Sequence, residues 1–245
     1  DLYSYKFKDE KWMKNRTVGF DSPVNIYEIH AGSWRKKGEG QTDWYTYIEL
    51  AKLLIPYVKK NHYTHIEMMP LSEHPFDGSW GYQNTGFFAP TARYGTPDEL
   101  KKFVDECHQA GIGVIMDFVP VHFAVDYYGL KEFDGTCLYE HLDPRQGYHP
   151  HWGTLIYNYG RPQVKNFLIA NALFWTEKFH ADGIRFDAVA SMLYLDFGRS
   201  SGNWIPNEDG GNQNYEAITF LKHLNSIVKK QYPGILLIAQ EDGLW

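Results

Sequence analysis

The chain has 245 residues, of which 43% are hydrophobic and 22% are charged, so it is long enough and apolar enough to bury a substantial core. Its formal net charge is -6 and no run is rich in Lys or Arg, which argues against nucleic acid or an acidic membrane as its partner. No stretch approaches the roughly 20 apolar residues of a membrane helix, and residues 1–16 lack the apolar centre of a signal peptide.

Short apolar runs alternate with amphipathic helical stretches, which is the pattern of repeated β/α units around a parallel sheet. Five apolar runs predict strands, at residues 24–31, 64–71, 112–119, 182–188 and 235–240. Apolar stripes at helical spacing predict four long helices between them. The residues of these stripes are Tyr47, Leu50, Ala51, Leu54 and Val58; Leu100, Phe103, Val104 and Cys107; Val164, Leu168, Ala172, Trp175 and Phe179; and Ala217, Ile218, Leu221, Leu224 and Val228.

The second of these helices has the clearest boundaries. Thr96 and Glu99 form a capping box around Pro97 at the first helical position, and Gly111 ends the helix. The first helix is interrupted by Pro56, so we expect it to be kinked or short. The third opens at residues 161–162, and the fourth covers residues 214–231.

Five strands, each followed by a polar segment, predict a (β/α)8 TIM barrel truncated after about the fifth strand. The longest polar loops follow strands 2 and 3. A doubly wound open sheet is the alternative, but neither G-x-G-x-x-G nor a P-loop follows the first strand. We expect residues 1–245 to be the N-terminal part of one barrel domain, and the start at Asp1 instead of Met indicates a piece of a longer protein.

The cysteine and aromatic contents indicate the cellular compartment and the kind of ligand. Cys107 lies on an apolar stripe and Cys137 in a loop, which indicates reduced thiols in the cytoplasm instead of a disulfide framework. Aromatic residues make up 17% of the chain, and although most will pack in the core, flat rings with a polar edge also suit stacking on sugars. Charge and aromatic content together favour a neutral, hydroxylated ligand.

Arg185 and Asp187 stand two residues apart in the apolar stretch "ADGIRFDAVASML". Alternate residues of a strand face opposite sides, so if Ile184 and Phe186 meet the helices, Arg185 and Asp187 point toward the barrel axis. There the arginine would hold the carboxylate ionised and oriented, as a nucleophile requires. A purely structural ion pair is the other interpretation.

Polar residues also follow the second and third predicted strands. Asp117 closes the third, His122 lies five residues further on, and Tyr82 falls in the loop after the second. A lone His or Asp at such a position is often only a packed or capping residue. The carboxyl ends of barrel strands share one rim, where barrels keep their catalytic groups, so we expect these residues to converge.

A metal-dependent barrel hydrolase is a second enzymatic interpretation. His122, His141, His149, His151 and Asp143 are numerous enough to suggest metal ligands. However, "YHPHW" lies in a loop instead of at the end of the first strand, and no further His ends the later runs. These features favour a site without a metal.

Five segments closely resemble the 1,4-α-glucan branching enzymes of the α-amylase superfamily: "DFVPVHF", "GIRFDAVASMLYLDFGR", "DGSWGYQNTGFFAPTARYG", "YHPHWGTLIYNYGRPQV" and "WIPNEDGGNQNYEAITFL". The resemblance extends from about residue 15 to the end of the chain. The strings after Asp187 and between Trp204 and Ile218 are similar to those of branching enzymes instead of amylases. An α-glucan hydrolase of the same superfamily is the alternative within this resemblance.

The resemblance implies a role for each matching residue. Asp187 matches the nucleophile that forms a covalent glucosyl intermediate, and Arg185 the arginine that positions it. Asp117 and His122 match residues that bind sugar hydroxyls, with Tyr82 stacked beneath the glucose. The implied substrate is an α-1,4-glucan such as glycogen, whose segments are transferred to 6-hydroxyls with retention. No cofactor, metal, nucleic acid or membrane is implied.

The chain departs from the family pattern at the acid/base position. The family has Ala-Glu followed by a second acid, and "IAQED" aligned without a gap places Gln240 there instead of Glu241. An amide cannot donate the proton that the leaving oxygen needs. Strand parity turns Glu241 to the opposite face unless a bulge or the end of the strand redirects it, in which case Glu241 takes the catalytic role. A non-catalytic glucan-binding copy is another alternative. The family's later His-Asp motif and the flanking carbohydrate-binding and C-terminal domains are also missing from these residues, so we expect the fragment to be inactive alone.

Overall fold

Five parallel strands form the central sheet of the computed structural model, which describes residues 4–16 and 22–241. Each predicted apolar run contains one of them, so all five strand predictions are confirmed. The strands are β1 (Ile26–Ile29), β2 (His65–Met68), β5 (Gly113–Phe118), β9 (Gly183–Phe186) and β10 (Leu236–Ala239).

The order of strands in the sheet is the order in the chain, β1-β2-β5-β9-β10, and each neighbouring pair is parallel. A doubly wound sheet would reverse its order at a switch point, so that alternative is wrong. Consecutive parallel strands wound in one direction are the arrangement of a β/α barrel. The register sets Asp117 of β5 opposite Arg185 of β9, which brings two predicted site residues side by side.

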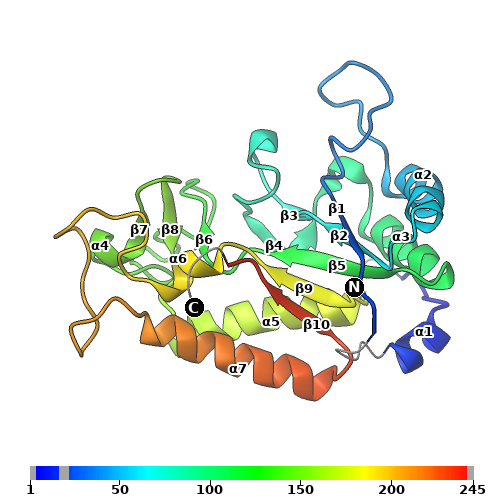
Figure 1. Ribbon diagram of the computed structural model, residues 1–245. Helices are drawn as coiled ribbons and strands as arrows, with labels where there is room; N and C mark the ends of the chain where they lie inside the picture. The colour runs from blue at the N-terminus through cyan, green and yellow to red at the C-terminus, as the bar shows by residue number, and fades with distance from the viewer. Residues whose placement is uncertain (1–3, 17–21, 242–245) are drawn as a thin grey trace.

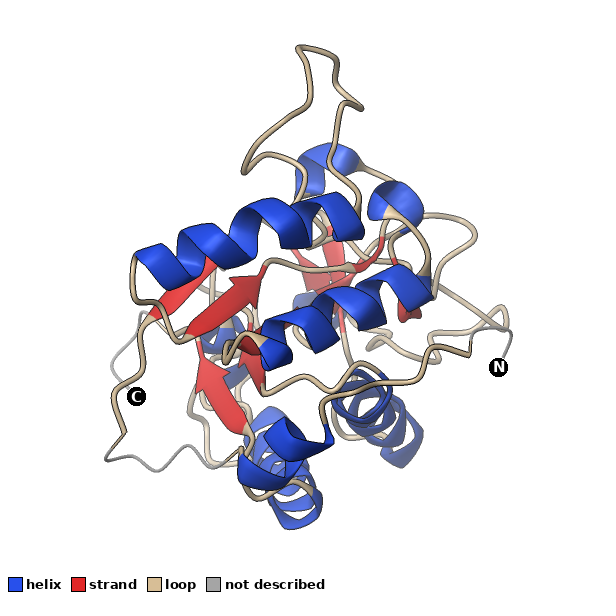
Figure 2. Cartoon of the chain, turned by 90° about the vertical axis from the view of Figure 1, so that its right-hand side faces the viewer, coloured by secondary structure: helices blue, strands red, loops and turns tan. Residues whose placement is uncertain are grey.

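Four long helices lie on the outer side of the curved sheet (Figures 1 and 2). Every helix in the described ranges is too short or too polar to span a lipid bilayer. The long helices are α2 (Tyr47–Lys60), α3 (Pro97–Gln109), α5 (Pro162–Lys178) and α7 (Tyr215–Gln231), and the short ones are α1 (Glu10–Asn15), α4 (Pro144–Gly147) and α6 (Val189–Leu193). The predicted capping box of α3 is present, with the Thr96 and Glu99 side chains each accepting from the backbone of the other residue.

Two details of the helix predictions are corrected. Helix α2 continues through Pro56 for a full 14 residues, because Pro56 and Lys52, whose carbonyl loses its helical partner, both face solvent. On α7 the buried face includes Phe220, whereas Ile218 and Leu221 are only partly buried. The face of α7 that meets the sheet is therefore turned slightly from the one that the sequence pattern predicted.

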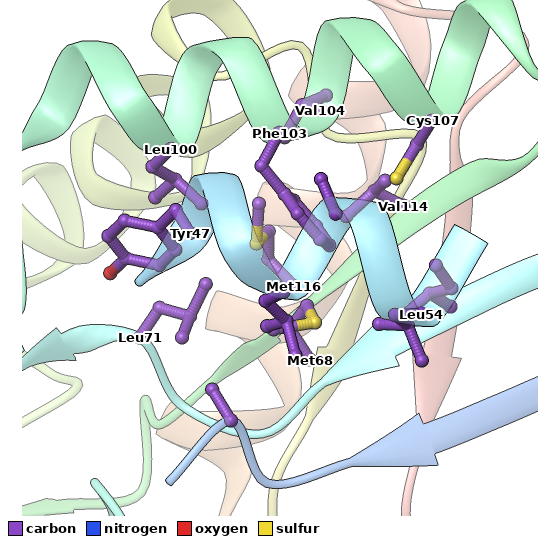
Figure 3. Packing of buried hydrophobic residues seen from close by; sticks show 14 of the residues in the cluster. Tyr47, Leu54, Met68, Leu71, Leu100, Phe103, Val104, Cys107, Val114 and Met116 are labelled. Atoms are coloured by element: carbon purple, nitrogen blue, oxygen red, sulfur yellow. The ribbon is translucent and has the colours of Figure 1, made fainter. Parts of the chain in front are cut away.

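The core between α2, α3 and the sheet is packed by side chains from all three (Figure 3). Tyr47 and Leu54 of α2 and Phe103 of α3 are completely buried against Met68 of β2 and Val114 of β5. A second cluster joins α5 and α7 to β9. Burial of these apolar faces against one side of the sheet leaves the other side for polar residues.

The two long loops contain strands that the sequence did not predict. The loop after β2 forms a hairpin of β3 (Ser72–Glu73) and β4 (Gly86–Pro90), with 3-10 turns at Asp77–Ser79 and Ala92–Tyr94. The loop after β5 forms a small antiparallel sheet of β6 (His122–Phe123), β8 (Thr154–Ile156) and β7 (Tyr148–His149). β3, β6, β7 and β8 have two or three residues each, too few to show a period-2 pattern, and β4 begins at Gly86 and ends at Pro90, which are typical turn residues. Cys137, in the same loop, and Cys107, on α3, are free thiols, as expected.

A buried ionic network joins the N-terminal segment to α3 and to the residue that precedes β9. His108 of α3 bonds through Nδ1 to Asp9 at 2.7 Å and through Nε2 to Asp182 at 2.8 Å. Burial lowers the pKa of His108, but these two hydrogen bonds raise it more, so the net shift is upward. Burial raises the pKa values of Asp9 and Asp182, and their bonds to histidine lower both more. His108 is therefore an imidazolium between two carboxylates.

We expect His108→Gln to lower the free energy of unfolding by about 3 kcal/mol, the low end of the range for a broken buried ion pair, because Asp182 keeps Arg16 at 3.6 Å and Asp9 keeps His180 at 2.8 Å. The stabilisation that His108 provides should be present below the ordinary pKa of His and be lost as pH rises through the elevated pKa of His108. The stabilisation that Asp9 and Asp182 provide should be present above the ordinary pKa of Asp and be lost as pH falls. Urea unfolding between pH 4 and 9 measures the free energy of unfolding on both sides of this range.

Lys102→Gln on the same helix serves as the control, since Lys102 is half exposed and pairs only loosely with Glu106 at 3.9 Å. It should change stability by less than about 0.5 kcal/mol. A His108→Gln variant as stable as the Lys102→Gln variant at pH 6 contradicts the stabilising role of the network.

Candidate active site

A cleft of about 540 Å³ opens at the carboxyl end of the sheet, between the loops after β2, β5 and β9. Four side chains predicted for the site line it: Tyr82, His122, Asp187 and Gln240. Two more, Arg185 and Asp117, contact these lining residues from the inner face of the sheet. The predicted convergence of three strand ends on one rim is therefore present in the fold.

Arg185 on β9 connects the polar side chains of the cleft. Its Nη1 donates to Asp187 Oδ1 and to Asp117 Oδ2, both at 2.8 Å, and its Nη2 donates to Gln240 Oε1 at 3.0 Å. Glu67 of β2 lies further away, with Oε1 3.9 Å from Nε. One planar cation thus sets the relative positions of groups from β5, β9 and β10, which is the geometric advantage of arginine over lysine.

Asp187 follows the last residue of β9 and lines the cleft. Ile184 and Phe186 belong to the cluster beneath the helices, so the predicted alternation along this strand is correct. Burial raises the pKa of Asp187, and the charge and hydrogen bond of Arg185 lower it less, so the net shift is upward. The predicted contact with Arg185 is present, but the net shift does not support the prediction that it holds the carboxylate ionised, because burial outweighs the arginine.

Asp117 and Tyr82 form a second pair beside Arg185. The Tyr82 hydroxyl donates to Asp117 Oδ2 at 2.9 Å, whereas Asp117 Oδ1 is buried without a partner in the described structure. Burial, helped by the nearby charge of Asp187 and opposed by Arg185, raises the pKa of Asp117 to about 8. Burial thus favours the protonated form of both carboxyl groups, and Arg185 between them favours the ionised form of both.

Gln240 lies in the cleft, and its neighbour Glu241 is not among the lining residues. Gln240 Oε1 accepts from Arg185 Nη2 and from the backbone N–H of Ala188, both at 3.0 Å. Because both partners are donors, the hydrogen bonds identify this atom as the oxygen of the amide and leave Nε2 as its other terminal atom. Gln240 is thus hydrogen-bonded to the same guanidinium as Asp187.

Flat rings form the wall of the cleft beside β6 and β7. The ring centroids of His122 and Trp152 are 5.0 Å apart, and Trp152 stacks on His149 at 3.8 Å with 5° between the planes. Burial lowers the pKa of His122 to about 3 and that of His149 to about 4. Both imidazoles are therefore neutral, and this wall presents the rings of His122 and Trp152 to the cleft without adding charge.

Several lining residues escaped the sequence prediction: Ser79, Gln83, His151, Trp152 and Phe197. The string "YHPHW" was considered for its histidines as metal ligands, yet its tryptophan, Trp152, also lines the cleft. Ser79 and Gln83 flank Tyr82 in sequence, which is the one local signal that could have identified them. Phe197 had no such signal, because it reaches the cleft only through the path of the loop after β9.

The histidines considered as metal ligands do not meet at one point. Within the described ranges, no three His, Cys, Asp or Glu side chains are grouped as a metal site requires. His141 faces Glu216 at 3.6 Å, and Asp143 caps α4 by accepting from the backbone N–H of Arg145. The metal-site interpretation therefore lacks the clustered ligands on which it depended.

Known proteins with similar sequences are α-amylase-type enzymes. Residues 37–153 match the family model of the α-amylase catalytic domain. The chain is 57% identical, over its full length, to the 1,4-α-glucan branching enzyme GlgB of Oleidesulfovibrio alaskensis, and 54% identical to that of Thermosynechococcus vestitus. The chain belongs to the branching-enzyme family of the α-amylase superfamily. It spans 39% of the length of the first of these relatives and 35% of the second.

Solved structures show the same fold at lower identity. A putative α-amylase from Salmonella typhimurium superposes with a TM-score of 0.71 at 23% identity, covering 98% of this chain and 34% of that one. An α-amylase from Geobacillus thermoleovorans, complexed with acarbose, gives 0.66 at 20% identity, covering 90% and 47%. The five parallel strands of this branching-enzyme family member therefore have the arrangement of the α-amylase barrel.

Proposed function

We propose that the cleft transfers segments of α-1,4-glucan to glucan 6-hydroxyls and so forms the α-1,6 branches of glycogen. The observation that carries the proposal is the carboxylate of Asp187, held by Arg185 at the edge of a cleft walled by aromatic rings. Relatives at 53–57% identity are named 1,4-α-glucan branching enzymes, which favours branching over hydrolysis and over glucan binding alone.

In the proposed reaction, Asp187 attacks the anomeric carbon of a glucan bound in the cleft and forms a covalent β-glucosyl ester. The bond to the leaving 4-oxygen breaks as that oxygen takes up a proton from water, since the amide of Gln240 has none to give. A glucan 6-hydroxyl then attacks the same carbon from the face opposite to Asp187 and passes its proton to water, while the ester bond breaks and its electron pair returns to Asp187. Arg185 orients the carboxylate, while Asp117, His122 and Tyr82 contact the sugar.

We further propose that residues 1–245 form the first five of eight β/α units within a longer polypeptide that also carries flanking domains. The relatives are more than twice as long, and within the described residues β1 and β10 each leave one edge unpaired, where the remaining strands of a barrel would pair. The two free thiols fit a cytoplasmic protein. Measurements of catalysis therefore use the complete polypeptide.

Glucan binding tests the proposal independently of catalysis. Trp152→Ala should weaken binding of maltoheptaose about tenfold, because it removes an aromatic face that can stack on glucose. Isothermal titration calorimetry measures the dissociation constant. Tyr127→Ala is the matched control, since Tyr127 is 94% exposed and outside the cleft. Equal affinities for the two variants, or no binding of maltoheptaose by the parent, would count against a glucan cleft.

A further inference from the structure

The cleft contains one carboxyl group where a retaining glycosyl transfer uses two. Among the described residues that line it, only Asp187 is an Asp or Glu. In a retaining site the second carboxyl protonates the leaving oxygen and later takes the proton of the acceptor. The place beside Asp187 is taken by Gln240, whose amide can form hydrogen bonds but cannot transfer a proton in either direction.

The hydrogen bonds of Gln240 fix which end of the amide is free. Its oxygen is engaged by Arg185 Nη2 and the Ala188 N–H, so Nε2 is the end left to face a ligand. That N–H group can stabilise negative charge that develops on a leaving atom. The nucleophile keeps its own support, since Asp187 Oδ1 is held by Arg185 Nη1 at 2.8 Å.

The other titratable side chains of the cleft are poor substitutes for the missing acid. The Tyr82 hydroxyl is committed to Asp117 at 2.9 Å, and its pKa is raised by burial and by that carboxyl group. His122 is buried and neutral, with its Nδ1 unpartnered in the described structure. Of the two histidines among the described residues that line the cleft, His151 is the exposed one, so a His151→Gln variant tests whether it acts as the acid.

We infer that this chain transfers glucosyl groups fastest from donors whose leaving group departs as an anion without taking up a proton, of which α-glucosyl fluoride is the simplest, and only slowly from unmodified glucan. The inference rests on the proposed function and specifies the donor class for the same cleft. The Asp187 carboxylate forms a bond to the anomeric carbon while the C–F bond breaks. Fluoride leaves with the electron pair, and no proton moves.

The second half of the reaction then limits turnover. A sugar hydroxyl that attacks the β-glucosyl ester must lose a proton, and Gln240 cannot accept it. The covalent intermediate should therefore accumulate on Asp187. An anionic nucleophile without a proton to lose, such as azide, can attack the anomeric carbon from the opposite face. The ester C–O bond breaks, its electron pair returns to Asp187, and α-glucosyl azide is formed.

The experiment follows fluoride release from α-maltotriosyl fluoride by the complete polypeptide, with and without azide. We expect a burst of one fluoride per protein, a mass increase of one maltotriosyl group located on Asp187 by peptide mapping, and about tenfold or more acceleration of steady turnover by azide. Asp187→Asn should show neither burst nor adduct. Gln240→Glu should turn over unmodified glucan and lose its stimulation by azide.

Three results overturn the inference. Fluoride release no faster than that of Asp187→Asn shows that the donor class is wrong. Turnover of unmodified glucan that disappears in His151→Gln identifies His151 as the acid. Steady release without an adduct and without an azide effect shows that a base is present. Maltoheptaose binding is measured in parallel. If the proposed function is wrong, maltoheptaose should not bind; if only the donor inference is wrong, maltoheptaose should still bind.

Discussion

Gln240→Glu is expected to raise the rate of branch formation on amylose by about 10²- to 10⁴-fold, the usual contribution of a positioned general acid. The substitution keeps the shape of the side chain, and a carboxylate oxygen can accept from Arg185 and Ala188 as the amide oxygen does. The negative charge of Asp187 opposes ionisation of the new carboxyl group and the hydrogen bond from Arg185 favours it, so the group can give and take a proton during the reaction. The fall in iodine staining of amylose measures the rate.

Gln41→Glu is the matched control for this gain. Gln41 lies in an exposed loop outside the cleft, so it receives the same change of charge without access to substrate. If the two variants branch amylose at the same rate as the parent, another residue is the acid and the assignment of Gln240 to that position is wrong.

Asp187→Asn in the Gln240→Glu background should lower the rate by about 10⁴-fold or more, because it removes the atom that forms the covalent bond. An asparagine keeps the size of the side chain and one acceptor for Arg185, so the loss should reflect chemistry instead of unfolding. The same iodine assay measures the loss, and thermal unfolding of both proteins checks that they remain folded.

Asp134→Asn is the control for that loss, since Asp134 lies in an exposed loop and bonds only locally to Thr136. It should leave branching unchanged. Branching by the Asp187→Asn variant at more than a tenth of the rate of its parent contradicts the nucleophile assignment, whatever the result at position 240.

The position of the site was predictable because it follows from local alternation. Ile184 and Phe186 had to meet the helices, so Arg185 and Asp187 had to face the other way. The sharing of Arg185 was not predictable in the same manner. The approach of Asp117 depends on the register of β5 against β9, and that of Gln240 on the place where β10 ends. The aromatic wall depends on how the loop after β5 folds back.

The sequence by itself determined the five strands, the four long helices and the face of β9 that carries charge. Each of these follows from a period or a cap spanning a few neighbouring residues. Only the tertiary structure decided that Pro56 is tolerated within α2, that His108 bridges Asp9 and Asp182, and that Gln240 shares a guanidinium with Asp187. These features depend on solvent exposure and on contacts between distant segments, which no local pattern records.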